Sequence, residues 1–130
     1  MSTRVLIADD EPNILLSLEF LLQQAGFDVA LARDGAEALE KAQQLHPQLI
    51  MLDVMMPRKN GYEVCQALRE DPGFADTRIL MLTAKGRETE VAKGLAVGAD
   101  AYVTKPFGTK ALLAQVQELL GGAVDAAGDA

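Results

Sequence analysis

Five short apolar segments alternate with five segments of helical periodicity along this chain, and this alternation restricts the folds that it can adopt. Each apolar segment is too short for a helix and is bounded by turn-forming residues, which is typical of a buried strand. The predicted strands are Arg4–Ala8, Asp28–Ala32, Leu49–Asp53, Arg78–Leu82 and Ala101–Thr104. The helices predicted from apolar side chains three and four positions apart run from Pro12 to a stop at Gly26 and over residues 36–44, 62–70, 89–97 and 109–120.

The connections between these segments are only a few residues long. Parallel strands need a crossover of about the length of a helix, so each predicted helix serves to join two strands. The strands are almost continuously apolar, which is expected when helices cover both faces of a sheet. We therefore predict an α/β protein with a three-layer, doubly wound (βα)5 arrangement, which is a flavodoxin-like fold. Five such units suggest a parallel five-stranded sheet in the order 2-1-3-4-5, although periodicity alone does not fix this order.

Length and composition fit one domain. The 130 residues, of which 49% are hydrophobic, suffice for a substantial core. We predict this domain over residues 1–120, and we expect residues 121–130, which hold few large apolar side chains, to form a flexible tail or the start of a linker.

No segment approaches the roughly 20 apolar residues of a membrane span, and the first strand begins too early for a signal peptide, so a cytoplasmic location is the default expectation.

Charge and cysteine content exclude several classes of function. The chain carries a formal net charge of −7 at pH 7 and has an isoelectric point near 4.6. This charge argues against direct nucleic-acid binding, because such binding draws on clustered Lys and Arg. The single cysteine, Cys65, cannot form an internal disulfide, and no group of Cys and His has the spacing of zinc ligands.

Polar side chains gather where the predicted strands end. Asp9 and Asp10 follow the first strand, and Asp53 ends the third. Thr83 follows the fourth strand and Lys105 the fifth. In the doubly wound order the first and third strands are neighbours, so Asp10 and Asp53 would face each other at the edge where such sheets bind ligands. Carboxylates in one cleft repel one another unless a cation lies between them, and oxygen ligands without His or Cys favour a hard ion. We therefore predict a Mg²⁺ site.

A hydroxyl and an ammonium beside such a site would allow it to hold a phosphoryl group. The metal ion, Thr83 and Lys105 would each neutralise or hydrogen-bond phosphoryl oxygens. Since a carboxylate is an established nucleophile for phosphoryl transfer, Asp53 is the candidate aspartyl-phosphate acceptor, and the acids after the first strand would bind the metal. Taken alone, Asp53 could equally be a helix cap or a loop acid, and those other acids could serve the dipole of the next helix. We predict that Glu11 interacts with the dipole of that helix or is a surface acid.

Five motifs, each at a predicted strand end, together resemble the receiver domains of two-component response regulators. The resemblance covers roughly residues 4–120. The motifs are Ile7-Ala8-Asp9-Asp10-Glu11, Leu52-Asp53-Val54-Met55-Met56-Pro57 with Asn60-Gly61, Leu82-Thr83-Ala84, Gly98-Ala99-Asp100-Ala101-Tyr102 and Lys105-Pro106-Phe107. Any one of them is a weak signal, whereas the five in this order are highly specific.

The resemblance implies roles for individual residues. Asp53 would be the phosphoacceptor and one of the groups around Mg²⁺. Asp10 and the backbone carbonyl of Met55 would bind the ion directly, and Asp9 would act largely through water. Lys105 would pair with the phosphate, and the peptide bond from Lys105 to the proline after it is expected to be cis.

Thr83 and Tyr102 resemble the switch pair of this family. The resemblance implies that the Thr83 hydroxyl moves toward the phosphate and that the Tyr102 ring turns inward to fill the space. Such a chain catalyses only its own phosphorylation and dephosphorylation and is not a turnover enzyme. Its expected partners are a sensor histidine kinase, as phosphodonor, and a downstream protein or output domain. That partner would contact the face made by the fourth helix, the fifth strand and the fifth helix.

The same face departs from the pattern of receivers that drive winged-helix DNA-binding regulators. Those receivers carry charged residues there that form symmetric salt bridges in a dimer. This chain keeps Lys93 and Asp100 but has Ala101, Ala111 and Gln115 where an acid, an acid and an arginine are usual. We therefore expect a monomer or a weak, phosphorylation-dependent dimer.

Two alternative functions remain open from the sequence. A haloacid-dehalogenase-type phosphatase also uses a strand-end Asp with Mg²⁺, but that family normally has a second Asp two residues later, where this chain has Met55. An unphosphorylated protein-interaction module of the same fold would have lost its site residues, whereas all five strand-end residues named above are present.

Overall fold

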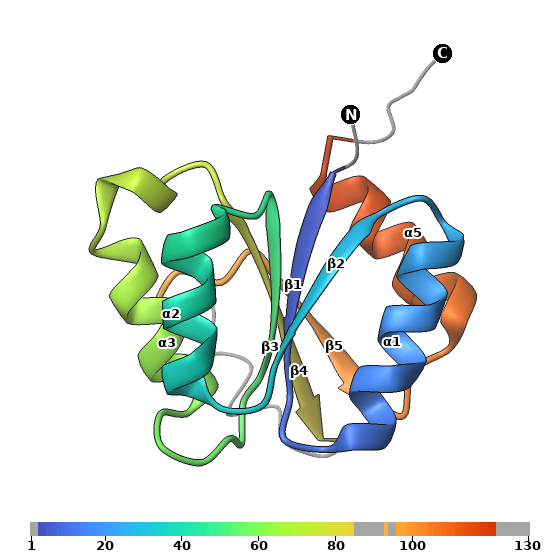
Figure 1. The fold of residues 1–130 in the computed structure, drawn as a ribbon, viewed down its shortest axis with the longest axis horizontal. Coiled ribbons are helices and arrows are strands. Elements are labelled where there is room, and N and C mark those ends of the chain that lie inside the picture. Colours follow the sequence, from blue (N-terminus) through green and yellow to red (C-terminus); the bar gives the residue numbers. More distant parts are fainter. Residues whose placement is uncertain (1–2, 85–92, 94–95, 122–130) are drawn as a thin grey trace.

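The computed structural model describes residues 3–84, 93 and 96–121, where strands and helices alternate (Figure 1). The elements are β1 (Arg4–Ala8), α1 (Pro12–Gln24), β2 (Asp28–Ala32), α2 (Gly35–Leu45), β3 (Leu49–Asp53), α3 (Gly61–Arg69), the short 3₁₀ helix η1 (Pro72–Phe74), β4 (Arg78–Ala84), β5 (Ala101–Lys105) and α5 (Thr109–Leu119). The five predicted strands and four of the predicted helices are confirmed to within two residues at their ends. Most of the helix predicted over residues 89–97 lies outside the described residues.

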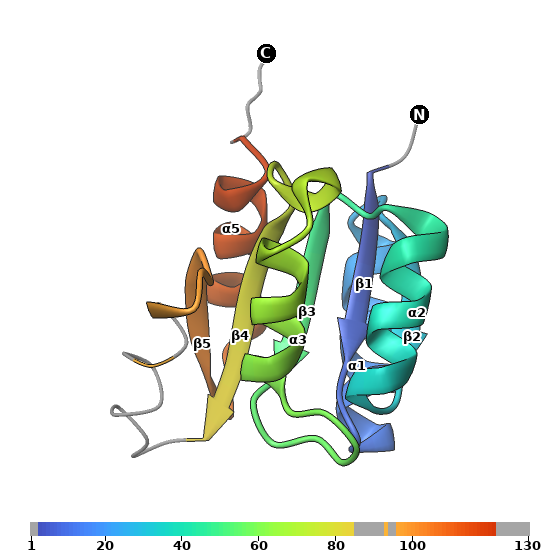
Figure 2. The ribbon, with the colours of Figure 1, turned by 90° about the vertical axis from the view of Figure 1, so that its left-hand side faces the viewer.

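The five strands form one parallel sheet, as predicted. Its order is β2-β1-β3-β4-β5, so β3 lies in the centre. The helices α1 and α5 cover one face of the sheet, and α2 and α3 cover the other (Figures 1 and 2). This arrangement is the doubly wound, flavodoxin-like fold expected from the sequence. The chain changes direction across the sheet between β1 and β3, so the carboxyl ends of these two strands flank the position where such sheets bind ligands.

Side chains of the inner strands alternate between two apolar layers. On β1, Val5 and Ile7 pack into the layer beneath α1 and α5, whereas Leu6 and Ala8 pack into the layer beneath α2 and α3. All five residues of β3 are buried. Because both faces of the sheet are covered, these strands are continuous apolar runs rather than alternating ones. The last residue of β3 therefore stands on a strand that is buried along its whole length.

Short polar side chains fix the starts of α2 and α3. Asp34 is the N-cap of α2, and its carboxylate accepts a hydrogen bond from the Glu37 N–H at 2.8 Å. Asn60 forms a capping box with Glu63, in which each side chain accepts a 2.9 Å hydrogen bond from the backbone N–H of the other residue. The third helix consequently begins one residue before its predicted start.

Two expectations about the chain as a whole stay predictions. Within residues 3–84, 93 and 96–121, no helix combines the length and the apolar character needed to cross a bilayer. Neither the cytoplasmic location nor the domain boundary at residue 120 is tested by this fold. Residues 122–130 lie outside the described part of the chain.

The chain turns sharply after β3 and returns against it at Gly61. The Gly61 N–H donates to the Val54 carbonyl at 3.0 Å. A Cβ atom at Gly61 would lie 2.6 Å from the carbonyl oxygen of Asp53 and 3.0 Å from the Cα of Val54, which is too close without movement of the backbone. Glycine is required here because the start of α3 packs directly against the backbone that carries Asp53.

We predict that Gly61→Ala lowers the free energy of unfolding by about 1 to 3 kcal/mol, because the backbone must move to accept the methyl group. Gly108→Ala is the matched control, since a Cβ atom at Gly108 meets no described atom within 4 Å. Urea unfolding of both variants beside the wild type measures the difference. Equal stabilities of the two variants would contradict the close approach at Gly61.

Candidate functional site

Four of the predicted site residues lie at the carboxyl edge of the sheet. Asp9 directly follows β1, Asp53 is the last residue of β3, and these two strands are paired neighbours. The strands β4 and β5 extend further than predicted, so that Thr83 and Lys105 belong to the strands rather than to the loops after them. The register pairs Asp53 with Leu82, which places Thr83 directly after the partner of Asp53.

The Asp53 carboxylate is almost completely buried. The residue is 5% exposed, and its Oδ1 accepts a hydrogen bond from the Met55 N–H at 3.3 Å. Burial, which is the largest influence, and the neighbouring Asp9 carboxylate raise the pKa of Asp53 from its ordinary 3.8 to about 7. The Lys105 ammonium and the Met55 N–H lower this pKa, and a hydrogen bond with Asp10 raises it. Near neutral pH the protein alone therefore stabilises the charge of Asp53 poorly.

The Lys105 side chain reaches into the acidic cluster. Its Nζ lies 2.8 Å from Asp9 Oδ2, 3.0 Å from Glu11 Oε1 and 3.4 Å from Asp53 Oδ1. Burial on its own would lower the pKa of Lys105, but hydrogen bonds to Asp9 and Glu11 and the charge of Asp53 outweigh burial and raise it. Lys105 therefore stays charged at physiological pH and contacts three carboxylates at once. The bond from Lys105 to Pro106 is cis, as expected.

Asp9, Asp10 and Asp53 can each direct one carboxylate oxygen toward a common point. These three oxygens lie within 4.8 Å of one another. Asp9 is fully buried and Asp10 is exposed, so the cluster opens to solvent beside Asp10. An oxygen-only donor set with this much negative charge fits a hard divalent cation such as Mg²⁺. Among the residues that the structure describes, the ion-pair partner of these acids is the Lys105 ammonium, which offsets only part of their charge.

The hydroxyl of Thr83 is buried and has no hydrogen-bond partner among the residues that the structure describes. Thr83 as a whole is 2% exposed. A buried hydroxyl without a partner costs free energy, and such groups are uncommon in folded proteins. The site thus combines a buried carboxylate, an ammonium, a buried hydroxyl and a cluster suited to a hard cation. This combination can hold a phosphoryl group.

The sequence matches proteins of one family. A profile of the response regulator receiver domain matches residues 5–117. Over 120 residues the chain is 45% identical to the alkaline phosphatase synthesis transcriptional regulatory protein PhoP of Bacillus subtilis, and the match covers 92% of this chain and 49% of PhoP. It is 44% identical to the DNA-binding response regulator MtrA of Mycolicibacterium smegmatis, with 92% of this chain and 51% of MtrA covered.

The fold matches solved structures of the same kind. The chemotaxis response regulator CheY4 of Vibrio cholerae superimposes with a TM-score of 0.87 at 38% identity, over 92% of this chain and 99% of CheY4. This chain belongs to the response regulator receiver domain family. It is a receiver of two-component systems, whose response regulators are signalling proteins rather than turnover enzymes. The receiver spans about half the length of the curated relatives named above.

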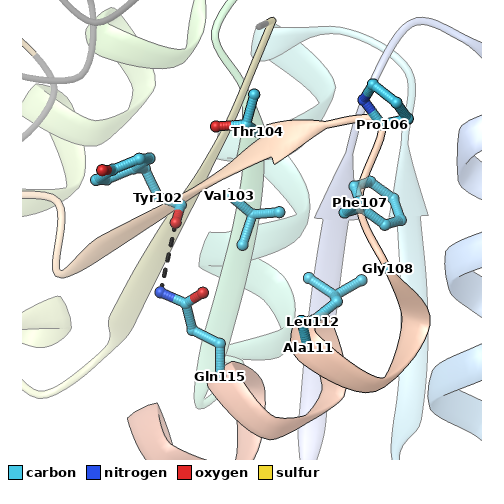
Figure 3. A pocket seen from close by; sticks show the side chains of 9 residues that line it. All are labelled: Tyr102, Val103, Thr104, Pro106, Phe107, Gly108, Ala111, Leu112 and Gln115. Atoms are coloured by element: carbon cyan, nitrogen blue, oxygen red, sulfur yellow. Dashed lines mark hydrogen bonds between the residues drawn. The ribbon is translucent and has the colours of Figure 1, made fainter.

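The predicted switch tyrosine of the receiver is turned outward. Tyr102 is 43% exposed and is one of the residues of β5, α5 and the segment between them that line a groove of about 490 Å³. Its ring points away from the side chains of Phe107 and Leu112 in this groove (Figure 3). The side-chain amide of Gln115 donates to the Tyr102 carbonyl at 3.4 Å and so links α5 to β5. The inward turn of the ring stays a prediction.

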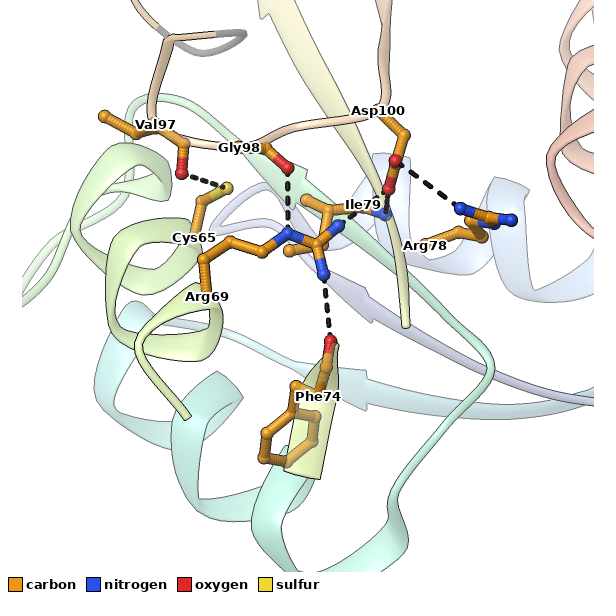
Figure 4. A network of polar contacts seen from close by, with 8 residues as sticks. All are labelled: Cys65, Arg69, Phe74, Arg78, Ile79, Val97, Gly98 and Asp100. Atoms are coloured by element: carbon orange, nitrogen blue, oxygen red, sulfur yellow. Dashed lines mark hydrogen bonds and ion pairs between the residues drawn. The ribbon is translucent and has the colours of Figure 1, made fainter. Parts of the chain in front are cut away.

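A polar network ties α3 of the receiver to the start of β5 (Figure 4). The Arg69 guanidinium donates to the carbonyls of Gly98 and Phe74 at 2.9 Å each. It also donates to the Asp100 carboxylate at 2.8 Å, and that carboxylate accepts a further 2.8 Å bond from the Ile79 N–H. Asp100, one of the charged residues kept on the dimer face, is therefore bonded within the receiver itself.

Sequence reasoning missed two of these contacts. The sequence assigns Glu11 to a helix dipole or to the surface, but its carboxylate contacts Lys105, which is 94 residues away. The run of three acids after the first strand could have indicated that Glu11 lies close enough to the site to contact its lysine. No spacing in the sequence indicates the contacts of Arg69, because they depend on how α3 packs. The Met55 N–H donates a hydrogen bond to the Asp53 carboxylate. The predicted role of the Met55 carbonyl as a metal ligand stays a prediction.

The raised pKa of Asp53 makes a pH-dependent contribution to the stability of the metal-free receiver. The folded protein, with a pKa of about 7 at Asp53, binds this proton more tightly than the unfolded chain, with a pKa near 3.8. The cost of burying the carboxylate is absent at low pH, where both states are protonated. It grows as the pH rises between these two pKa values and is complete above the folded-state pKa.

We predict that Asp53→Asn, with a chelator present, exceeds the wild type in free energy of unfolding by on the order of 2 kcal/mol at pH 8. This advantage should shrink toward zero near pH 4, below which Asp53 is protonated in both states. Urea unfolding at several pH values measures the difference, and the carboxyl groups away from this site cancel because both proteins carry them. An advantage that does not change with pH would contradict the raised pKa.

Proposed function

We propose that this receiver accepts a phosphoryl group on Asp53 from the phosphohistidine of a sensor histidine kinase, in a Mg²⁺-dependent reaction, and thereby changes the surface that it presents to a partner. The observation that carries the proposal is the meeting, at one edge of the sheet, of a buried Asp53, the Lys105 ammonium and a Thr83 hydroxyl that has no partner in the described part of the chain. A buried carboxylate charge is costly, and phosphorylation would convert Asp53 into an acyl phosphate whose charge lies on the phosphoryl oxygens. A buried hydroxyl without a partner is also costly, and a phosphoryl oxygen would give Thr83 one.

The proposed transfer forms one bond and breaks one. A carboxylate oxygen of Asp53 attacks phosphorus, the P–N bond to the kinase imidazole breaks, and the imidazole nitrogen keeps the electron pair. Asp9, Asp10 and Asp53 would hold Mg²⁺, with the carbonyl of Met55. Bound Mg²⁺ would supply positive charge to the phosphoryl oxygens and favour the ionised form of Asp53.

Two further side chains would hold the transferred group. The Lys105 ammonium, 3.4 Å from Asp53 Oδ1, would pair with one phosphoryl oxygen. The Thr83 hydroxyl would donate to another, so that its buried oxygen gains a partner. Tyr102 would then turn from its exposed position into the space beside Thr83. The charge change at Asp53 would in this way alter the conformation of β5 and of α5, which packs against it.

The output partner of the receiver would contact the face formed by the fourth helix, β5 and α5. PhoP and MtrA are named as a transcriptional regulatory protein and a DNA-binding response regulator, and the match covers about half of each. We infer that this receiver controls a downstream protein or an attached output domain and does not bind DNA itself, which its net charge of −7 disfavours.

A salt-bridged dimer through this face is disfavoured. Asp100 already bonds Arg69 at 2.8 Å within the receiver, and Ala101, Ala111 and Gln115 replace charged residues of the usual pattern. A monomer or a weak, phosphorylation-dependent dimer is therefore the proposed state.

Intact mass after incubation with acetyl phosphate and Mg²⁺ tests the proposed phosphorylation. The wild type should gain about 80 Da, the mass of one phosphoryl group, and only when Mg²⁺ is present. Asp53→Asn should gain nothing. Asp76→Asn is the matched control, because Asp76 is an exposed acid away from the site, and this variant should gain the same mass as the wild type.

Two results would contradict this proposal. An adduct that persists in Asp53→Asn would mean that another residue accepts the phosphoryl group. Failure of the wild type to gain mass, together with failure to bind the phosphoryl mimic beryllofluoride, would favour the unphosphorylated protein-interaction module.

A further inference from the structure

Glu11 occupies the N-cap position of α1 but does not cap the helix. Its backbone is extended, and its side chain makes no hydrogen bond to the first turn. The backbone of Glu11 is fixed on both sides, because its N–H donates to Asp9 Oδ1 at 2.9 Å and its carbonyl accepts from the Leu15 N–H at 3.1 Å. The Glu11 carboxylate instead accepts a hydrogen bond from Lys105 Nζ at 3.0 Å.

The ammonium of Lys105 has three N–H donors, and the protein directs three carboxylates at it. The separations are 2.8 Å to Asp9 and 3.0 Å to Glu11, but 3.4 Å to Asp53. Lys105 is thus held closer to the two acids after β1 than to the proposed phosphoacceptor. A phosphoryl group on Asp53 would need this same ammonium.

Of the two acids that compete with Asp53, Glu11 is the one that can withdraw. The side chain of Asp9 is fully buried, so it cannot exchange Lys105 for water without leaving a charge buried and unpaired. The side chain of Glu11 is 60% exposed, and an exposed carboxylate exchanges its ion-pair partner for water at small cost. The contact between Glu11 and Lys105 is therefore the weakest point of the arrangement around the ammonium.

We propose that Glu11 is a positioning residue that holds Lys105 back from Asp53 until a phosphoryl group displaces the Glu11 carboxylate from the ammonium. This inference rests on the proposed function of Asp53. Glu11 does not touch the phosphoryl group and acts only through Lys105. Its presence lowers both the rate at which Asp53 is phosphorylated and the affinity of the site for a phosphoryl mimic.

Two substitutions separate the contact of Glu11 from its charge. Glu11→Asp keeps the charge, but aspartate at an N-cap prefers to accept hydrogen bonds from the N–H groups of the first turn, so its carboxylate leaves Lys105. Glu11→Gln removes the charge and weakens the contact. Glu40→Gln is the matched control for the change in net charge, because Glu40 is exposed on α2.

The test measures the initial rate of Asp53 phosphorylation by acetyl phosphate at saturating Mg²⁺. Both Glu11 variants should react about three- to tenfold faster than the wild type, as expected when a largely exposed, charge-assisted hydrogen bond no longer competes. The concentration of beryllofluoride that half-saturates the site should fall by a similar factor in both. Glu40→Gln should match the wild type in both measurements.

Two results would overturn the proposed role of Glu11 without affecting the proposed function of Asp53. If Glu11→Gln is faster but Glu11→Asp matches the wild type, Glu11 acts only by repelling the anionic phosphodonor. If every protein gains the phosphoryl group at the same rate, Glu11 has no influence on Lys105. Failure of the proposed function gives a different result, because then no protein, including the wild type, gains mass or binds beryllofluoride, and both proposals are overturned.

Discussion

The burial of the Asp53 carboxylate at the end of the central strand is the constraint on which the whole site depends. Asp53 is 5% exposed and lies beside Asp9, and burial together with this neighbour raises the pKa of Asp53 to about 7. Lys105 offsets part of the negative charge, yet it is shared with Asp9 and Glu11. A site that holds its acids in this way is unfavourable without a ligand, and its polar groups fit a divalent cation and a phosphoryl group.

The parallel sheet brings these groups together because they come from the carboxyl ends of four neighbouring strands. The ends of β1 and β3 supply the acids, while β4 and β5 supply Thr83 and Lys105. The backbone after Asp53 is held in turn by the close approach of Gly61. Just before the start of β5, the Arg69 network bonds Asp100 within the receiver. The start of β5 is therefore held by hydrogen bonds, while its last residue, Lys105, lies at the site. We propose that a change at Asp53 acts on β5 through this last residue.

The sequence predicted the elements and their order well, because apolar strands and amphipathic helices have different periods and because turn residues separate them. It also predicted that Asp9, Asp10, Asp53, Thr83 and Lys105 lie together, since parallel strands bring their carboxyl ends to one edge, while the roles of these residues stay predictions. It did not predict the ends of β4 and β5, which are set by pairing between strands rather than by local residues. Nor did it predict the contacts of Glu11 and Arg69, which join residues far apart in the chain through side chains whose directions only packing determines.

Thermal unfolding of the receiver against Mg²⁺ concentration at pH 8 tests most directly whether the acidic cluster is a cation site. Binding to the folded state alone stabilises it, so the melting temperature of the wild type should rise by about 3 to 8 °C between chelator and about 10 mM Mg²⁺. Asp10→Asn removes the exposed acid of the cluster without disturbing the core, and its melting temperature should rise much less. An unchanged melting temperature in the wild type, or an equal rise in the two proteins, would contradict the account.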